Sequence, residues 1–522
     1  MYGRNGEPGA APGAQIDTAG PLCYRGARRG EERLSGLSSM RTASVASRWL
    51  DAMLVVLASA TLIGTIRVAL TLDLPLAWGT EGWNAYHAAQ AAAGQNPYPP
   101  PSGLFYDNYP PLGFYIVGLL STLTGDALVA GRAVSLLAFL TIGLGVAAAA
   151  RLMGCERREA AFAALLFSTI LLFDYTYVGM NDPQLLGQAI QIGGLVLVLR
   201  ERRTDASMLL AALLFVAGFF TKHSLVIQPL AAGVWLLVYD RRNGIRLAAF
   251  GLLLLLFGMI GFRFAFGTSL WSQLDSARVW LLQYSLHAMG ARSQAGLVPL
   301  AASLALLRWF RRDTHVVLCV AYLAASLVCA AYFLGGAGVG SKALYDAVIA
   351  LSLCGGVGAN RLANLRLKGA PLRPLYAACH FVPVVAMLIY HPLTGTLPPH
   401  WWSRSSPPLV DTTRDVAFLK VREGRALCYQ LTLCYWSGKP AEIDVWGYIQ
   451  AVTVGARDGR ELHEAIARRR YAVLQLQAAP DIWGPRPEVD AAYVRGLNRL
   501  IEANYRLDHT SANGTFWVPK SR

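Results

Sequence analysis

The chain has 522 residues, of which 54% are hydrophobic and only 15% are charged. This composition excludes a disordered or fibrous protein. Together with a mean hydropathy of +0.37, it indicates a membrane protein that crosses the bilayer several times. In a soluble protein the net charge of +15 would suggest a nucleic-acid partner, so the positions of the 47 basic residues decide what that charge means.

The N-terminal 48 residues are rich in Gly, Ala, Pro, Ser and Arg and have no apolar period. They predict a disordered cytoplasmic tail, and Met40 leaves the start of translation open. The first apolar run lacks a small-residue cleavage site, so we expect it to stay as an anchor rather than to be removed as a signal peptide.

Eleven apolar runs are predicted to cross the bilayer, which needs about 20 mainly apolar residues. They lie near residues 52–72, 128–150, 160–175, 184–199, 206–221, 224–239, 247–266, 295–310, 315–334, 343–359 and 375–392. A further run, Pro111–Thr124, is short and contains Gly113 and Gly118. Counting it as a span would invert every later loop, so it is predicted to be an interfacial or re-entrant helix.

Basic residues mark alternate loops between these spans. Five loops together hold sixteen of them, whereas the alternate loops hold only Lys222, Arg278, Arg292 and Lys342, and residues 71–110 hold none. By the positive-inside rule the N-terminus is cytoplasmic, and an odd number of crossings then leaves the C-terminus outside. The basic excess therefore reports topology and does not call for a nucleic-acid partner.

The character of the chain changes after the last span. Residues 411–522 carry frequent charges, and their apolar runs are as short as strands. Helices are predicted at Asp458–Arg469 and Glu488–Ala503, a strand at Tyr471–Leu476, and a hairpin with Asn513-Gly514 at its turn. Cys428 and Cys434 could pair if this compartment is oxidising, or remain as thiols.

The expected fold is an all-α polytopic membrane domain with about eleven transmembrane helices, followed by a small α/β extracytoplasmic domain. The membrane domain is assigned to residues 49–395, with a first outer loop at 71–127, and the outer domain to residues 396–522. No repeat of 20 to 50 residues stands out, so a solenoid is not expected.

Polar residues at the outer face form the candidate site. Glu81 lies in the first outer loop among Trp, Tyr, Asn and His residues, Asp174 and Asp182 lie in the second, and Lys222 and Lys342 stand at span ends. Charged groups at a membrane surface are costly and tend to mark function. A carboxylate can act as a general base, a Lys can hold a phosphate, and aromatic rings can stack on a sugar. The candidate substrate-binding residues are Lys222, Lys342, His223, Asn84, Tyr86, Tyr98 and Tyr109.

Each candidate also has a structural interpretation. Glu81 could cap a helix, Asp174 and Asp182 could be solvated loop acids, and both lysines could extend from span ends to the lipid headgroups. His223 could be a polar span end. No Cys or His cluster has metal-ligand spacing, so no metal or other cofactor is predicted, although a carboxylate-bound divalent ion is not excluded by the sequence.

The order of motifs resembles that of the GT-C superfamily of integral-membrane glycosyltransferases. The motifs are TEGWNAYHA and NPYPP, then YPPLGFYIVGLLSTLTGD with Arg132 in the following span, then MNDPQ, TKHS and GSK. The resemblance covers roughly residues 50–395 and is to the branch of protein mannosyltransferases, lipid A aminoarabinose transferases and rhizobial lipopolysaccharide glycosyltransferase-like proteins.

The resemblance implies roles for particular residues. Glu81 takes the place of the acid that acts as base or positions the acceptor, and Asp182, then Asp174, takes the place of the supporting acid. Lys222 and Lys342 are the candidates to hold the phosphate of a polyprenyl-phosphate sugar. This chain departs from the family at Thr80-Glu81, where the family often has Asp or an Asp-Glu pair.

The sequence thus predicts a multi-pass enzyme of the bacterial inner membrane, with its C-terminal domain in the periplasm. It would transfer a sugar from a polyprenyl-phosphate donor to a lipid-glycan or protein acceptor. Two alternatives stay open: a transporter or flippase of lipid-linked sugars, and a non-catalytic membrane scaffold.

Overall fold

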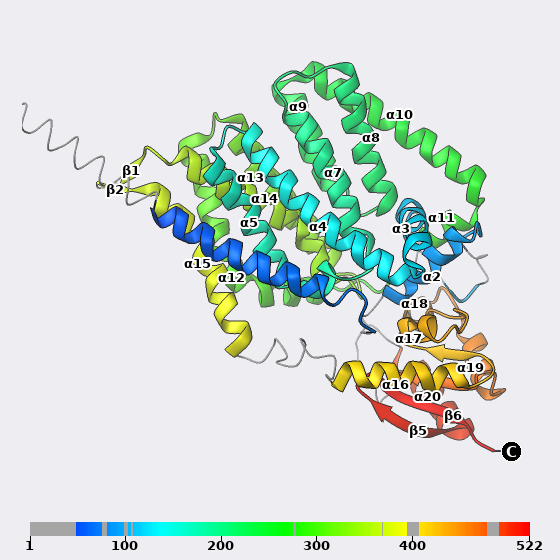
Figure 1. Ribbon diagram of the computed structural model, residues 1–522. Helices are drawn as coiled ribbons and strands as arrows, with labels where there is room; N and C mark the ends of the chain where they lie inside the picture. Colours follow the sequence, from blue (N-terminus) through cyan, green and yellow to red (C-terminus); the bar gives the residue numbers. More distant parts are fainter. Residues whose placement is uncertain are drawn as a thin grey trace, which may run out of the picture. The chain divides into compact units, whose positions relative to one another are not determined.

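The computed structural model describes residues 48–75, 81–98, 103–105, 108–274, 278–367, 369–393, 407–477 and 490–521. Leu50–Arg522 form one compact unit, to which the following description applies (Figure 1). Residues 1–47 of the predicted N-terminal tail and Thr80 lie outside the described residues.

A helix coincides with each of the eleven predicted spans. These helices are Arg48–Ala69, α4 (Ala127–Leu152), α5 (Arg157–Leu172), α7 (Pro183–Leu199), α8 (Asp205–Thr221), α9 (Ile227–Tyr239), α10 (Arg241–Phe266), α12 (Leu282–Phe310), α13 (Thr314–Leu334), α14 (Tyr345–Arg361) and α15 (Leu372–Leu393). The shorter elements among them are α2 (Glu81–Ala92), α3 (Leu112–Thr124), α6 (Tyr175–Val178), α11 (Ser269–Leu274), the 3-10 turn η1 (Ser341–Leu344), and the small hairpin of β1 (Arg366–Leu367) and β2 (Ala370–Pro371).

Six of the described helices are long and apolar enough to cross a membrane. They are Arg48–Ala69, Ala127–Leu152, Arg241–Phe266, Thr314–Leu334, Ser341–Arg361 and Leu372–Tyr390. The remaining predicted spans correspond to helices that are shorter or, as in α12, apolar only in part. The structure therefore supports a multi-pass membrane protein, whereas the count of eleven crossings stays a prediction.

Carboxylates fix where several of these helices begin. Asp126 accepts hydrogen bonds from backbone N–H groups at the start of α4, Asp182 does so for α7, and Asp313 for α13. Such caps satisfy donors that have no partner inside the helix, and their negative charge suits the helix dipole. These caps fix the first residues of α4, α7 and α13. The cap of α7 thereby fixes the position of Asp182.

Helix α10 shows how the apolar surface is used. It packs on α8 and α9, yet only 6% of its most apolar window is buried inside the protein. Leu252, Leu256, Phe257 and Phe264 are exposed on it. A surface of this kind is stable against lipid and would be costly in water.

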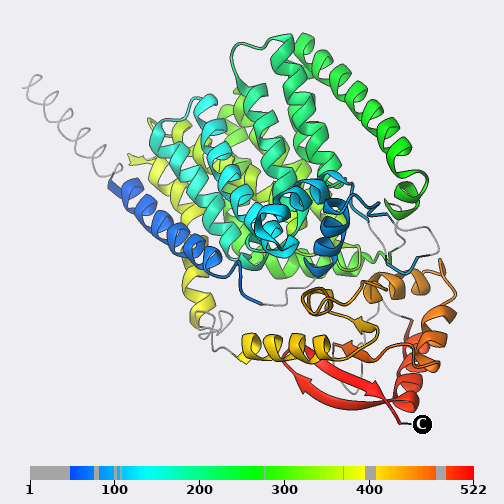
Figure 2. The ribbon, with the colours of Figure 1, turned by 45° about the vertical axis from the view of Figure 1, so that its right-hand side comes forward.

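The C-terminal part has mixed structure, as predicted (Figure 2). Its helices are α16 (Pro407–Val421), α17 (Leu431–Trp436), α18 (Val445–Thr453), α19 (Arg460–Ala467) and α20 (Ala491–Asn504). Its sheet has the order β3-β4-β6-β5, built from Ala426–Cys428, Val473–Leu476, Gly514–Pro519 and Tyr505–Ser511, respectively. The predicted strand and hairpin are present, and the parallel partner β3, which the sequence analysis did not identify, completes a βαβ unit with β4.

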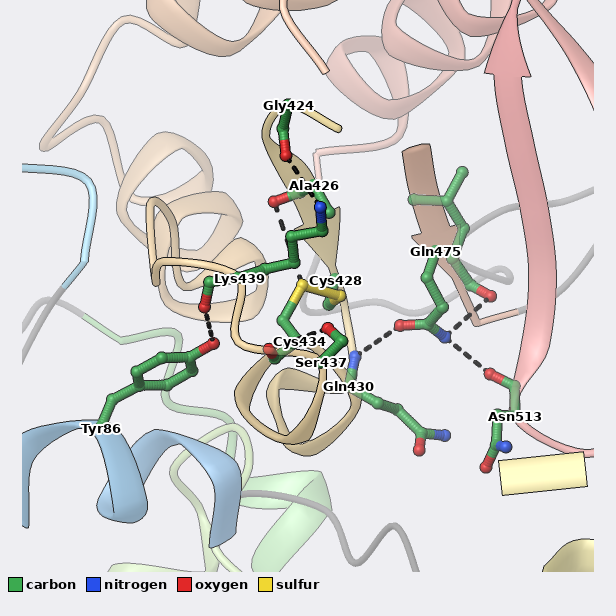
Figure 3. Close-up of a disulfide and its surroundings, with 11 residues drawn as sticks. Tyr86, Gly424, Ala426, Cys428, Gln430, Cys434, Ser437, Lys439, Gln475 and Asn513 are labelled. Carbon is green, nitrogen blue, oxygen red and sulfur yellow. Dashed lines mark hydrogen bonds between the residues drawn. A yellow bond between two sulfur atoms is a disulfide. The ribbon is translucent and has the colours of Figure 1, made fainter. Parts of the chain in front are cut away.

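Cys428 and Cys434 form a disulfide that joins the end of β3 to α17 (Figure 3). Their Cα atoms are 6.0 Å apart, within the ordinary range for a disulfide. Nearby, the Tyr86 hydroxyl donates to the carbonyl oxygen of Lys439 at 2.5 Å, so helix α2 of the first outer loop contacts the disulfide-bonded segment.

Candidate active site

Three charged side chains from distant parts of the sequence meet in one cluster. Asp182, at the start of α7, is buried with only 4% of its surface exposed. Its Oδ1 lies 3.3 Å from the Nζ of Lys222, which follows α8, and its Oδ2 lies 2.7 Å from the Nζ of Lys342 in η1. One carboxylate thereby fixes two ammonium groups, which we call the lysine pair.

The charges of the cluster support one another. Burial alone would raise the pKa of Asp182, but Lys222 and Lys342 lower it well below its ordinary value. Burial lowers the pKa of Lys222, and Asp182 opposes that shift. Asp182 is therefore ionised at neutral pH, and an additional anion beside the lysine pair would be stabilised electrostatically.

Tyr109 lies between the two ammonium groups. Its hydroxyl is 3.3 Å from the Nζ of Lys342, and the Nζ of Lys222 is 4.8 Å from its ring centroid, which is cation–π geometry. The hydroxyl of Tyr98 donates to the backbone carbonyl of Tyr109 at 2.8 Å and braces it. Burial would raise the pKa of Tyr109, but the lysine pair lowers it.

A cavity of about 1200 Å³ opens beside this cluster. Helix ends and the C-terminal part both contribute to its wall, which includes Tyr109, Lys222, His223, Arg278, Lys342, Asp346, Asp444, Trp446 and Gln450. Burial, followed by the charges of Lys222 and Arg278, lowers the pKa of His223 to about 4, so this ring is neutral at pH 7. A cavity of this size accommodates a sugar or a larger polar headgroup.

Glu81 makes a different set of contacts. It is completely buried at the start of α2, and its two carboxylate oxygens accept from the guanidinium of Arg132, with Nε to Oε2 at 2.9 Å. The backbone N–H of Asn181 also donates to Oε2 at 3.4 Å. Glu81 thus ties α2 to α4 and to the residue that precedes Asp182, and it lies outside the described cavity wall.

The short segment that ends at Asp182 is held on several sides. The side-chain amide of Asn84 donates to the backbone carbonyl of Asn181 at 2.5 Å. The hydroxyl of Ser135 donates to the backbone carbonyl of Met180. Gly131 allows the close approach of α4, because a Cβ at that position would lie 2.0 Å from the Asn181 side chain. These contacts orient Asp182 toward the lysine pair.

Asp174 supports the turn that carries Lys342. Its Oδ2 accepts from the hydroxyls of Ser341 and Tyr345, the latter at 3.0 Å. These two residues flank Lys342 closely in sequence, so Asp174 holds the turn that carries this lysine.

The predicted site residues thus fall into two groups. Lys222, His223, Lys342 and Tyr109 line the cavity, whereas Asp182, Asp174, Glu81, Asn84 and Tyr98 lie behind them and hold the first group in place. Tyr86 contacts the C-terminal part instead. Their roles in any reaction stay predictions. Among the described residues, no group of three or more His, Cys, Asp and Glu side chains could hold a metal ion.

Many residues of the cavity wall were not identified from the sequence as site residues, and two of them are charged residues near the lysine pair. Arg278 lies over Trp446, with its guanidinium carbon 5.7 Å from the ring centroid, and adds a further cation to the wall. Asp346 is the only acid in the predicted span 343–359 and follows Lys342 by four residues. A lone acid within an apolar span was the signal that would have identified it.

Residues 108–264 match the family described as dolichyl-phosphate-mannose-protein mannosyltransferase. The matched segment contains Tyr109, Asp182, Lys222 and His223, and over this part of the chain it confirms the predicted resemblance to protein mannosyltransferases. No curated protein matches the sequence.

Several solved structures are similar to this chain, ArnT and AglB among them. ArnT from Cupriavidus metallidurans bound to undecaprenyl phosphate has a TM-score of 0.48 at 17% identity, covering 86% of this chain and 87% of ArnT. The archaeal oligosaccharyltransferase AglB from Archaeoglobus fulgidus, in complex with an inhibitory peptide and a dolichol-phosphate, has a TM-score of 0.48 at 12% identity, covering 89% and 74% of the two chains.

Proposed function

We propose that the protein is a membrane glycosyltransferase that moves a sugar from a polyprenyl-phosphate donor to a lipid-glycan or protein acceptor. The observation that carries the proposal is the lysine pair on the cavity wall, held by Asp182 and Tyr109. Three of these four residues, Tyr109, Asp182 and Lys222, lie within the segment that matches the mannosyltransferase family.

The lysine pair suits the leaving group of such a reaction. An acceptor oxygen forms a bond to the anomeric carbon as the bond from that carbon to the phosphate oxygen breaks. The electron pair of the broken bond stays on the polyprenyl phosphate, and the acceptor proton passes to a base. Lys222 and Lys342 face the negative charge that develops on the departing phosphate, and charge stabilised in a preorganised cavity lowers the barrier.

Glu81 enters this proposal as a positioning residue. Both of its oxygens are engaged by Arg132, and a carboxylate held by a buried guanidinium is a weak proton acceptor. Through the backbone of Asn181, the same carboxylate helps to position Asp182. The resemblance predicted that Glu81 acts either as a base or as an acid that positions the acceptor. Of these two roles, we propose positioning.

The proposed location is the bacterial inner membrane, with the reaction on the periplasmic side. The Cys428–Cys434 disulfide supports this location, since structural disulfides persist in oxidising compartments. It also agrees with the basic residues of the loops that the charge pattern assigns to the cytoplasm.

The proposal is tested by changing Lys222 and Lys342 to Ala, one at a time, in a strain that lacks the native chain. Mass spectrometry of envelope glycolipids and glycoproteins should show a sugar addition restored by the wild type and reduced about 100-fold or more by either variant. Lys420→Ala, an exposed lysine on α16, is the matched control and should retain transfer. Normal transfer by both cavity variants would reject the proposal.

A further inference from the structure

A carboxylate lies in the same cavity, about one helical turn beyond Lys342. Asp346 is on α14, is half-buried and belongs to the cavity wall. The hydroxyl of Tyr322 on α13 donates to its Oδ1 at 2.6 Å. Among the residues that the structure describes, Asp346 has no ion-pair partner, which is unusual for an acid within a membrane span.

Uncharged polar groups surround this carboxylate. The amide of Gln188, which is completely buried on α7, approaches Asp346. Gln188 itself is not part of the described cavity wall. The hydroxyl of Ser326 on α13 is buried and makes no hydrogen bond with a described residue, and Ser326 lines the cavity, as does Gln184 one turn before Gln188.

These groups differ from the lysine pair in the ligand that they suit. Buried amides and hydroxyls without partners are costly unless a polar ligand or water satisfies them. A carboxylate accepts hydrogen bonds from hydroxyl or ammonium groups and repels a phosphate. The separation between Lys342 and Asp346 also suits a sugar, because four helical residues rise by about 6 Å. This is similar to the distance from a phosphate to the far hydroxyls of the pyranose that it carries.

We propose that Asp346, Gln184 and Ser326 bind the sugar of the donor while the lysine pair holds its phosphate. This inference rests on the proposed function and deepens it, because it makes these three residues determinants of sugar specificity. The carboxylate of Asp346 favours a neutral or amino sugar and disfavours a uronic acid or any other sugar that bears a negative charge.

The experiment measures which donor the purified full-length protein retains. Wild-type and variant proteins in lipid nanodiscs are incubated with polyprenyl-phosphate lipids extracted from the host membrane and supplemented with an equal amount of undecaprenyl phosphate. Native mass spectrometry then gives the ratio of sugar-bearing to sugar-free polyprenyl phosphate bound. The wild type should enrich the sugar-bearing lipid.

Asp346→Asn should lower that ratio by about tenfold or more, because it replaces a charged hydrogen-bond acceptor with a neutral one. Ser326→Ala should lower it in the same direction. Both variants should retain undecaprenyl phosphate itself, which also shows that they are folded. Asp205→Asn, an exposed acid at the far end of α8 from Lys222, is the matched control and should keep the wild-type ratio.

The outcomes separate the two levels of the proposal. A wild-type ratio in both Asp346→Asn and Ser326→Ala would overturn the sugar subsite and leave the proposed function standing. If the Asp346–Tyr322 hydrogen bond had only a structural role, Asp346→Asn would change retention of both lipids equally. That result would also overturn the sugar subsite. A wild-type protein that retains neither lipid would reject the proposed function itself.

Discussion

The contact between Glu81 and Arg132 determines how the early acid of the first outer loop acts. Both side chains are completely buried, and Arg132 also donates to the backbone carbonyls of Leu72 and Leu74 at 3.1 and 2.7 Å. A buried ion pair of this kind is costly to break from one side, because one charge then loses its counter-charge in a dry environment. Removal of one partner and removal of both are therefore expected to differ.

Glu81→Gln should lower the unfolding temperature and reduce transfer, because it leaves Arg132 without this carboxylate at a cost of about 3–5 kcal/mol. The double variant Glu81→Gln, Arg132→Gln should regain much of the stability and part of the transfer if Glu81 is a positioning residue. Thermal unfolding in detergent and transfer in membranes measure the two effects. Asp51→Asn is the matched control, since its ion pair with Arg158 is exposed and contributes about 0–1 kcal/mol. A double variant that regains stability but no transfer would return Glu81 to the role of base.

At the scale of helices and strands, apolar length and charge placement were sufficient to predict most of the membrane domain. Each predicted span coincides with a helix, and Pro111–Thr124 forms α3. These signals are local, so a single sequence carries them. β3 was missed because Ala426–Cys428 is only three residues long and is defined by pairing with β4, which lies more than forty residues away.

The site was predictable as a set of residue types at one membrane face but not as a set of contacts. Charge placement located Asp182, Lys222 and Lys342 near the same surface, yet their contact depends on how α7, α8 and η1 pack. The pairing of Glu81 with Arg132 depends on packing between α2 and α4 in the same way. These contacts join residues that are distant in the sequence, and local sequence patterns do not show which helices pack together.

Helix α2 provides a test of the packing between the first outer loop and the C-terminal part. A Cβ at Gly82 would lie 2.1 Å from the backbone nitrogen of Thr432, so Gly82→Ala should push α2 from α17 and cost about 1–3 kcal/mol. Gly233→Ala on α9 is the matched control, because a Cβ there meets nothing within 4 Å. This control should be neutral or stabilising by up to about 1 kcal/mol. Thermal unfolding and limited proteolysis of the two variants measure the difference, and equal behaviour would contradict this contact.

At the scale of the whole molecule, the basic loops and the cavity lie at opposite ends of the same helices. Helix α7 runs from Asp182 at the cavity to the basic segment at Arg200, and α8 returns from Asp205 to Lys222. The C-terminal part meets the cavity end, where the amide of Val279 donates to Gln450 and that of Asp444 donates to the carbonyl of Leu104. We therefore predict one orientation for the molecule. The basic loops face the cytoplasm, and the cavity and the disulfide face the opposite side of the membrane.

That prediction is tested by single cysteines introduced at exposed positions and labelled with a membrane-impermeant maleimide. Lys420 on α16 is exposed, and Lys420→Cys should react in intact spheroplasts, because the C-terminal part is predicted to face outward. Arg202→Cys in the loop between α7 and α8 should react only after the membrane is permeabilised, since the positive-inside rule places that loop in the cytoplasm. The parent chain, labelled in parallel, gives the background of its native thiols. The reverse pattern would place the lysine pair on the cytoplasmic side, where a disulfide between Cys428 and Cys434 would be exposed to cellular reductants. A periplasmic acceptor would then be ruled out even if the transfer reaction itself were confirmed.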